Sequence, residues 1–149
     1  VEVQGWQVTG PTGVDLTFVG DLRFSSGAIG QFFSSFQAAR GSDADLIGST
    51  GIIHLDYPWV NYVGVDATVT ISKDSTGRRR GTFGDSIQDR ESETLVFKNV
   101  NGYRDEVDSM AASILDGAEP VIPLDDSRGN VATVVALQRS ARERRPVSL

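Results

Sequence analysis

The sequence predicts an α+β domain, in which an open, mainly antiparallel sheet is followed by two C-terminal helices packed on one of its faces. Along much of residues 1–98, hydrophobic residues alternate with polar or small ones, which is the period-2 pattern of half-buried strands. From residue 103 to residue 145 the apolar positions recur with the period of a helix. Strands joined by short turns favour an antiparallel meander, and strands followed by helices define the α+β class.

Six stretches carry the strand pattern. The alternation from Val14 to Phe24 predicts the first strand, and Ser25-Ser26-Gly27 predicts the turn after it. The other predicted strands are residues 28–40, 44–48, 51–56, 62–72 and 94–100. The polar, glycine-rich stretch 72–93 predicts a long loop before the last of them.

The first predicted helix carries an apolar stripe at positions i, i+3, i+4, i+7 and i+8. Its members are Val107, Met110, Ala111, Ile114 and Leu115. Gly117 is expected to end this helix at the C′ position, where glycine adopts the left-handed conformation at the lowest cost.

A second helix is predicted at roughly residues 127–144. Either Asp125 or Asp126 would cap its start, and Pro146 follows its end. The last four residues, PVSL, are expected to return as a short edge strand. Because both helices are expected on one face of the sheet, the other face would be left uncovered. We therefore expect that face to contact a second copy of the chain, which makes the protein a homo-oligomer.

The composition excludes several classes of protein. A length of 149 residues fits one domain, 1–149, with its own core. The net charge of −6 argues against a nucleic-acid partner, and no apolar run approaches the roughly 18 residues of a membrane span. The absence of cysteine excludes disulfides, thiolate metal sites and a cysteine nucleophile, and it fits a reducing compartment such as the cytoplasm.

Two basic clusters stand out against this acidic background. The run from Arg78 to Arg80 is interpreted as part of a solvated loop. The cluster from Arg142 to Arg145 is interpreted as complementing the negative end of a helix dipole.

A group of carboxylates, Asp105, Glu106 and Asp108, precedes the first helical stripe. Such a group could bind a metal or move protons, but a metal site would need further converging ligands, and the sequence marks none. The favoured interpretation is structural: Asp105 caps the helix and Asp108 follows three residues later, where acids are stabilised by the helix dipole.

His54 is the single histidine, so any Ser-His-Asp triad would have to be built on it. It shares a predicted strand face with Asp56, and a structural or interfacial role is favoured. There is no HExxH motif, which argues against a catalytic zinc.

Glycine pairs occur at Gly10 and Gly13 and at Gly48 and Gly51. Neither pair forms a GxGxxG motif or a P-loop, and the second lies between two strands, where it predicts a hairpin turn.

Tyr57 and Trp59 flank Pro58 after a strand, and they could line a pocket or pack in a core or interface, with packing favoured.

The order of residues in the last third resembles the end of the Gfo/Idh/MocA oxidoreductases, the glucose-fructose oxidoreductase and inositol dehydrogenase family. The matching residues are Glu106, Met110, Ile114, Gly117, Pro120, Pro123, Asp126, Ala136, Ser140, Arg145-Pro146-Val147 and Leu149. Two earlier segments, LRFSSGAIGQFFSSF and LIGSTGIIHLDYPW, also resemble family patterns. One departure is Arg144, where many relatives have glycine after the last helix.

The resemblance implies a two-domain parent, with an N-terminal Rossmann domain for NAD or NADP and a C-terminal domain for substrate and subunit contacts. The present chain would be the second domain, which agrees with its lack of an initiator Met. The family's glycine-rich fingerprint and catalytic lysine have no matching position here, so no catalytic, cofactor-binding or metal-binding residue is assigned. No cofactor is expected on the chain alone, which would itself be inactive.

Three residues are candidates for lining a sugar or polyol substrate: Arg40, Trp59 and Tyr103. Each is a large polar or aromatic group near the end of a predicted strand or helix. The alternative hypothesis is a binding or assembly domain with no enzymatic activity.

Overall fold

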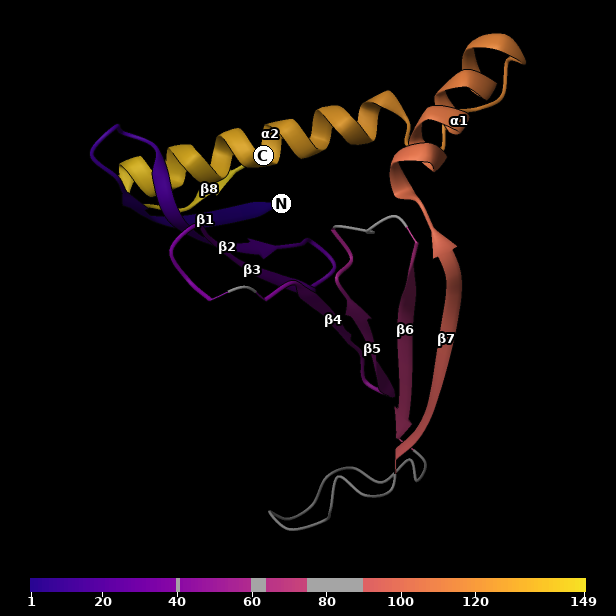
Figure 1. The fold of residues 1–149 in the computed structure, drawn as a ribbon. Helices are drawn as coiled ribbons and strands as arrows, with labels where there is room; N and C mark the ends of the chain where they lie inside the picture. Colours follow the sequence, from indigo (N-terminus) through magenta and orange to yellow (C-terminus); the bar gives the residue numbers. More distant parts are fainter. Residues whose placement is uncertain (40, 60–63, 75–89) are drawn as a thin grey trace. The chain divides into compact units, whose positions relative to one another are not determined.

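The computed structural model describes residues 1–39, 41–59, 64–74 and 90–149 (Figure 1), and it divides into two compact units. Unit 1 comprises Val1–Ala39 and Glu119–Leu149. Unit 2 comprises Arg40–Ala118. The arginine run from Arg78 to Arg80 lies outside the described residues.

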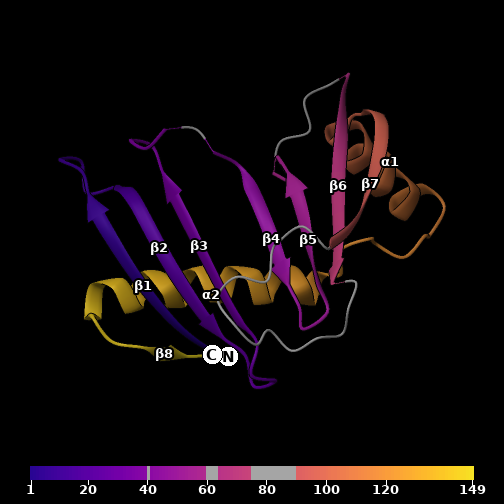
Figure 2. The same ribbon diagram turned by 90° about the horizontal axis from the view of Figure 1, so that it is seen from below.

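Unit 1 is a four-stranded antiparallel sheet covered by one helix. The strand order is β3-β2-β1-β8, and Figure 2 shows the helix α2 running along one side of β1, β2 and β3. The bounds are β1 Glu2–Thr9, β2 Asp15–Arg23, β3 Ile29–Ser35, α2 Leu124–Glu143 and β8 Val147–Ser148. The predicted edge strand at the C-terminus is confirmed, because β8 pairs with β1.

The core of unit 1 lies between α2 and the sheet. Its buried side chains are Val3, Phe18, Ala136, Leu137 and Val147. They come from β1, β2, α2 and β8, so burying them brings the two ends of the sequence together. At about 25 cal/mol per Å² of apolar surface, each large member contributes on the order of 1.5–3 kcal/mol.

A buried hydroxyl fixes α2 against β1. Ser140 is fully buried, and its Oγ accepts a hydrogen bond from the backbone N–H of Gly5 at 3.1 Å. The same Oγ donates to the carbonyl oxygen of Arg145 at 2.6 Å. The backbones approach so closely that a Cβ on Gly5 would lie 2.5 Å from the carbonyl oxygen of Leu137, so only glycine fits at this position.

Unit 2 is an antiparallel meander followed by a helix. Its strands are hydrogen-bonded in the order β4-β5-β6-β7, and α1 leads off from the end of β7 (Figure 1). The bounds are β4 Asp43–Ile47, β5 Gly51–Asp56, β6 Val65–Asp74, β7 Arg90–Val100 and α1 Gly102–Leu115.

The α+β class, with antiparallel strands first and two helices last, is confirmed. The described strands form two four-stranded ladders rather than the one open sheet predicted, because β3 ends at Ser35 and β4 begins a separate ladder. The predicted loop 72–93 is strand at both ends, and its residues 75–89 lie outside the described part.

Both predicted helix caps are wrong, because each helix begins earlier than its pattern suggested. In α1 the N-cap is Asn101, whose Oδ1 accepts from the backbone N–H of Arg104 at 3.1 Å, and Asp105 lies within the first turn. In α2 the N-cap is Pro123, which offers no side-chain acceptor. Asp125 and Asp126 follow in the first turn, where the helix dipole still favours them.

The predicted helix ends are confirmed. Gly117 follows the last turn of α1 with a φ of 68°, the left-handed C′ conformation. Arg144 caps α2 with a φ of 54°, so a non-glycine residue adopts the conformation that glycine takes more cheaply. Arg142 lies in the last turn of α2, as the dipole argument predicted for the basic cluster.

We predict that Ser140→Ala lowers the free energy of unfolding by about 1–3 kcal/mol, because it leaves the buried Gly5 N–H without its partner and removes the partly buried bond to the Arg145 carbonyl. Denaturant unfolding followed by circular dichroism measures the change. The matched control is Ser127→Ala, an exposed serine on the same helix, which should change stability little. Equal effects of the two substitutions would contradict the role of Ser140.

Candidate functional site

Two of the three predicted substrate-lining residues lie at the same end of the unit 2 sheet. Trp59 follows the C-terminal end of β5, and Tyr103 lies in the first turn of α1, just after β7 ends. Alternate strands of an antiparallel meander end on the same side, so both reach the end where β6 begins. Trp59 is 75% exposed and Tyr103 is 68% exposed, which leaves both available for contacts. The third candidate, Arg40, lies outside the described residues.

At this end of the sheet the pairing of β6 with β7 shifts by one residue. Val65 pairs with Val100 and Ala67 pairs with Phe97, so Asp66 faces two residues, Lys98 and Asn99. Two residues opposite one is the arrangement of a β-bulge, which redirects side chains and is frequent beside functional sites.

Asp66 organises the bulge through its carboxylate. Oδ2 accepts from Lys98 Nζ, and Oδ1 accepts from the backbone N–H of Asn99 at 3.2 Å. The bond from Lys98, and then the bond from Asn99, lower the pKa of Asp66 below its ordinary value of 3.8. Asn99 has a φ of 52°, a left-handed conformation that asparagine tolerates better than most residues.

An open pocket of about 530 Å³ lies at the junction of the bulge and α1. Its lining residues are Gly64, Lys98, Asn99, Val100, Asn101, Arg104, Asp105 and Asp108. The charged members are two cations and two carboxylates, and Arg104 Nε donates to Asp108 Oδ2 at 3.3 Å. The lining offers both donors and acceptors of hydrogen bonds, so it suits a small polar molecule.

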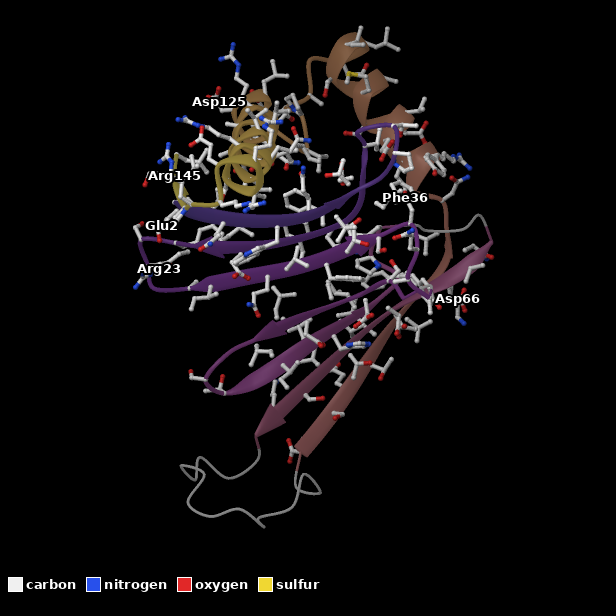
Figure 3. All side chains as sticks on the ribbon, turned by 90° about the vertical axis from the view of Figure 1, so that its left-hand side faces the viewer. Glu2, Arg23, Phe36, Asp66, Asp125 and Arg145 are labelled. Carbon is white, nitrogen blue, oxygen red and sulfur yellow. The ribbon has the colours of Figure 1, made fainter. Side chains whose placement is uncertain are left out.

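A smaller pocket of about 370 Å³ lies on the unit 1 sheet, and its charged side chains have partners, as most of those in the unit 2 pocket do. Gln31 Nε2 donates to Asp21 Oδ1 at 2.9 Å, and Arg23 and Glu2 form an ion pair at 4.0 Å (Figure 3). The strained bulge and the adjoining helix start therefore make the unit 2 pocket the stronger candidate site.

The carboxylate group of α1 has a structural geometry. Asp105 lies in the first turn, and Asp108 pairs with Arg104 one turn away. Among the described residues, no group of three or more His, Cys, Asp or Glu side chains has the geometry to bind a metal ion. The predicted cap role of Asp105 is wrong, because the cap is Asn101, and Asp105 is the acid of this group that lies in the first turn.

His54 lies on β5, and both of its ring nitrogens contact carboxylates. Nδ1 is 2.7 Å from Asp45 Oδ1, and Nε2 is 3.2 Å from Asp56 Oδ1. A triad histidine needs one nitrogen facing a nucleophile. With both nitrogens engaged in this way, the favoured structural interpretation of His54 agrees with the geometry.

Sequence reasoning missed four residues of the pocket lining, Lys98, Asn99, Asn101 and Arg104, and the neighbouring Asp66 of the bulge. The sequence did contain a local indication of this site: Asn99 and Asn101 flank Val100 immediately before the helical pattern. Asparagine is favoured both in the left-handed conformation and at helix N-caps, so this pair indicates a bulge followed by a helix start. The contact between Asp66 and Asn99, 33 residues apart, has no such local signal.

Comparison with known proteins identifies the fold. No family model and no curated protein matches the chain. Among solved structures, an aldose-aldose oxidoreductase from Caulobacter crescentus, crystallised with glycerol, aligns over 100% of this chain with a TM-score of 0.74 and 20% identity. A proposed NADPH-dependent oxidoreductase from Desulfitobacterium hafniense aligns with a TM-score of 0.69 and 19% identity, and the proposed oxidoreductase YvaA from Bacillus subtilis with 0.69 and 15%.

The chain spans only 41–44% of the length of these three structures. It therefore has the fold of about two fifths of such an oxidoreductase, in agreement with the resemblance seen in its sequence. Separately, none of the helices in the described part of the chain is long and apolar enough to cross a membrane.

We predict that Asn99→Val destabilises the chain by about 1–3 kcal/mol, because a β-branched residue is strained at a φ of 52°. Asn99→Gly should be neutral or slightly stabilising, since glycine adopts this conformation freely. Urea unfolding of the two variants provides the measurement. A valine variant as stable as the glycine variant would show that the left-handed conformation at residue 99 is not required.

Proposed function

We propose that the chain is the C-terminal substrate-binding and oligomerisation domain, residues 1–149, of an NAD(P)-dependent oxidoreductase of the Gfo/Idh/MocA type. The observation that carries the proposal is the fold match over the whole chain to about two fifths of an aldose-aldose oxidoreductase. The ordered motif from Glu106 to Leu149 in the sequence supports the same assignment.

The proposed substrate is a sugar, a polyol or a related hydroxyl or carbonyl compound. The similar Caulobacter enzyme is named for aldoses and was crystallised with glycerol. The unit 2 pocket supports this class, because Lys98, Asn101 and Arg104 supply donors while Asp105 and Asp108 supply acceptors for hydroxyl groups. Arg40, Trp59 and Tyr103 remain proposed contacts from the surrounding segments.

The nicotinamide cofactor would be bound by a separate Rossmann domain, which carries out hydride transfer while the present domain positions the substrate. One similar structure is described as NADPH-dependent, which supports NAD or NADP as the cofactor of the parent protein. The cysteine-free composition fits a reducing compartment, and we propose the cytoplasm.

Self-association is proposed through the sheet face of unit 1 that points away from α2. Trp6, Val19 and Phe33 are paired in register across three strands, so their side chains form one apolar row on this face. Trp6 is 48% exposed and Phe33 is 63% exposed, and an exposed apolar row of this kind marks an interaction surface.

The decisive experiment titrates the 149-residue chain separately with a polyol and with NADPH, while amide NMR signals are followed. Glycerol or an aldose should shift the signals of Lys98, Asn101 and Arg104 in a saturable way, and NADPH should not bind saturably. Saturable NADPH binding or hydride transfer by the chain alone would contradict the proposal. If neither ligand binds, a binding or assembly domain without enzymatic activity becomes the better interpretation.

We predict that Arg104→Gln weakens polyol binding by about tenfold, which corresponds to about 1.4 kcal/mol, because a donor is lost from the pocket lining. The matched control is Arg128→Gln, which removes an exposed arginine that also pairs with an aspartate on a helix. The same titration measures both variants. Equal affinities for the two would remove Arg104 from the proposed site.

We predict that Phe33→Glu shifts the chain toward the monomer, because it places a charge in the apolar row. Light scattering across micromolar concentrations measures the mass. The control Leu124→Glu changes a still more exposed apolar residue of unit 1 that lies on α2, and it should leave the mass unchanged. A wild-type chain that is monomeric throughout this range would contradict self-association through the sheet.

A further inference from the structure

A chain of side-chain hydrogen bonds centred on His54 crosses three strands of the unit 2 sheet. Asp45 on β4 contacts Nδ1 at 2.7 Å, and Asp56 on β5 contacts Nε2 at 3.2 Å. The second oxygen of Asp56 accepts from Thr68 Oγ1 on β6 at 2.8 Å. The imidazole ring therefore links the edge strand β4 to the interior of its sheet.

The protonation state of His54 decides whether both ring contacts are attractive. An ionised carboxylate only accepts hydrogen bonds, whereas a neutral imidazole has one donor nitrogen and one acceptor nitrogen. Both contacts can be hydrogen bonds only when the ring is an imidazolium. Loss of the proton leaves a nitrogen lone pair directed at a carboxylate, which is repulsive.

The contact between His54 and Asp45 affects how firmly β4 is held, because β4 lies at the edge of its sheet. Among the strands that the structure describes, β4 pairs with β5 alone in the order β4-β5-β6-β7, and it is five residues long. Edge strands with few ladder bonds open more easily than central strands. The contact from His54 to Asp45 is a charge-assisted bond that adds to the ladder at the middle of β4.

We propose that His54 is a pH-operated clamp, which fastens the edge strand β4 to the sheet through Asp45 while the ring is protonated and releases it when the proton is lost. The proposal is independent of the enzymatic assignment, because it requires only the side chains of β4, β5 and β6.

The surroundings of the ring favour its charged form. The charged groups described on this sheet face near His54 are Asp43 and Asp45 from β4 and Asp56 from β5. The neighbouring residues of β6 and β7 on the same face are uncharged: Thr68, Thr70, Ser92 and Thr94. Asp66, further along β6, already pairs with Lys98.

These contacts shift the pKa values of His54 and Asp56 in the directions that keep the two groups charged. The hydrogen bond to Asp45, and then that to Asp56, raise the pKa of His54 above its ordinary value of 6.5. The bond from Thr68, and then that from His54, lower the pKa of Asp56 below 3.8.

The stabilisation from His54 is therefore complete below pH 6.5 and is lost as the pH rises through the raised pKa. The contribution of Asp56 is complete above pH 3.8 and is lost as the pH falls through its lowered pKa. The clamp is therefore closed below pH 6.5 and opens as the pH rises through the raised pKa of His54.

The first test is an NMR titration of the His54 ring in the full chain from pH 5 to pH 9. Because His54 is the single histidine, its ring signals are identified directly. The expected result is a pKa above 6.5, with protons on both ring nitrogens at the acidic end. A pKa at or below 6.5 would overturn the proposal.

The second test measures hydrogen exchange of the β4 amides against those of β6 across the same pH range, corrected for intrinsic exchange. Protection of β4 should fall in a step at the measured pKa of His54, while β6 should show no step. His54→Gln should abolish the step, and Asp45→Asn should lower the pKa of His54 and weaken the protection. A step that is absent in the wild type, or that persists in His54→Gln, would overturn the clamp.

The matched control is Asp43→Asn. It removes the same charge from the same strand face, but Asp43 is paired in register with Asp56 rather than with His54. It should change the pKa of His54 less than Asp45→Asn does. Equal changes would show that the net charge of the face, rather than the hydrogen bond from His54 to Asp45, controls the ring.

Discussion

The close approach of α2 to β1 is the constraint on which unit 1 depends, and the hydroxyl of Ser140 makes that approach possible. A helix this near a strand must present small side chains, and Ala136 and Ser140 supply them one turn apart. The strand must present no side chain at the contact, and Gly5 meets that requirement. Alanine at position 140 would fit the space, but it would leave the buried Gly5 N–H without a partner and remove the bond to the Arg145 carbonyl.

The same contact explains why the chain can turn back after α2. Arg144 takes a left-handed conformation that is unfavourable for a side chain with a Cβ, and the Ser140 bond to the next carbonyl holds it there. Val147 then enters the core opposite Val3. The spacing from Ala136 through Ser140 to Val147, which carried the resemblance to an oxidoreductase family, thus has a packing reason in this chain. A sequence pattern of this kind reports the fold more directly than it reports the chemistry.

The sequence predicted periodic elements well and non-local contacts poorly. Strands with clear alternation and helices with an apolar stripe were found, because the period of the side chains is a local property. The caps were misplaced because Asn101 and Pro123 precede the apolar stripes by several residues, and the acids nearer to the stripes are equally plausible caps. The bulge at Asp66 and Asn99 was missed because it arises from the register between two strands far apart in sequence.

The apolar residues of α1 show how far local patterning can mislead about packing. The stripe predicted the helix correctly, yet Val107, Met110, Ile114 and Leu115 are all exposed, and α1 has no buried residue. Proteins bury apolar surface of this extent against a further domain or subunit, since leaving it in water forgoes about 25 cal/mol per Å². The exposed stripe lies on the same helix as Arg104, Asp105 and Asp108, which line the proposed substrate pocket. A domain or subunit that covered the stripe would therefore lie against the helix that lines the pocket, so binding at that interface and access to the pocket would be coupled.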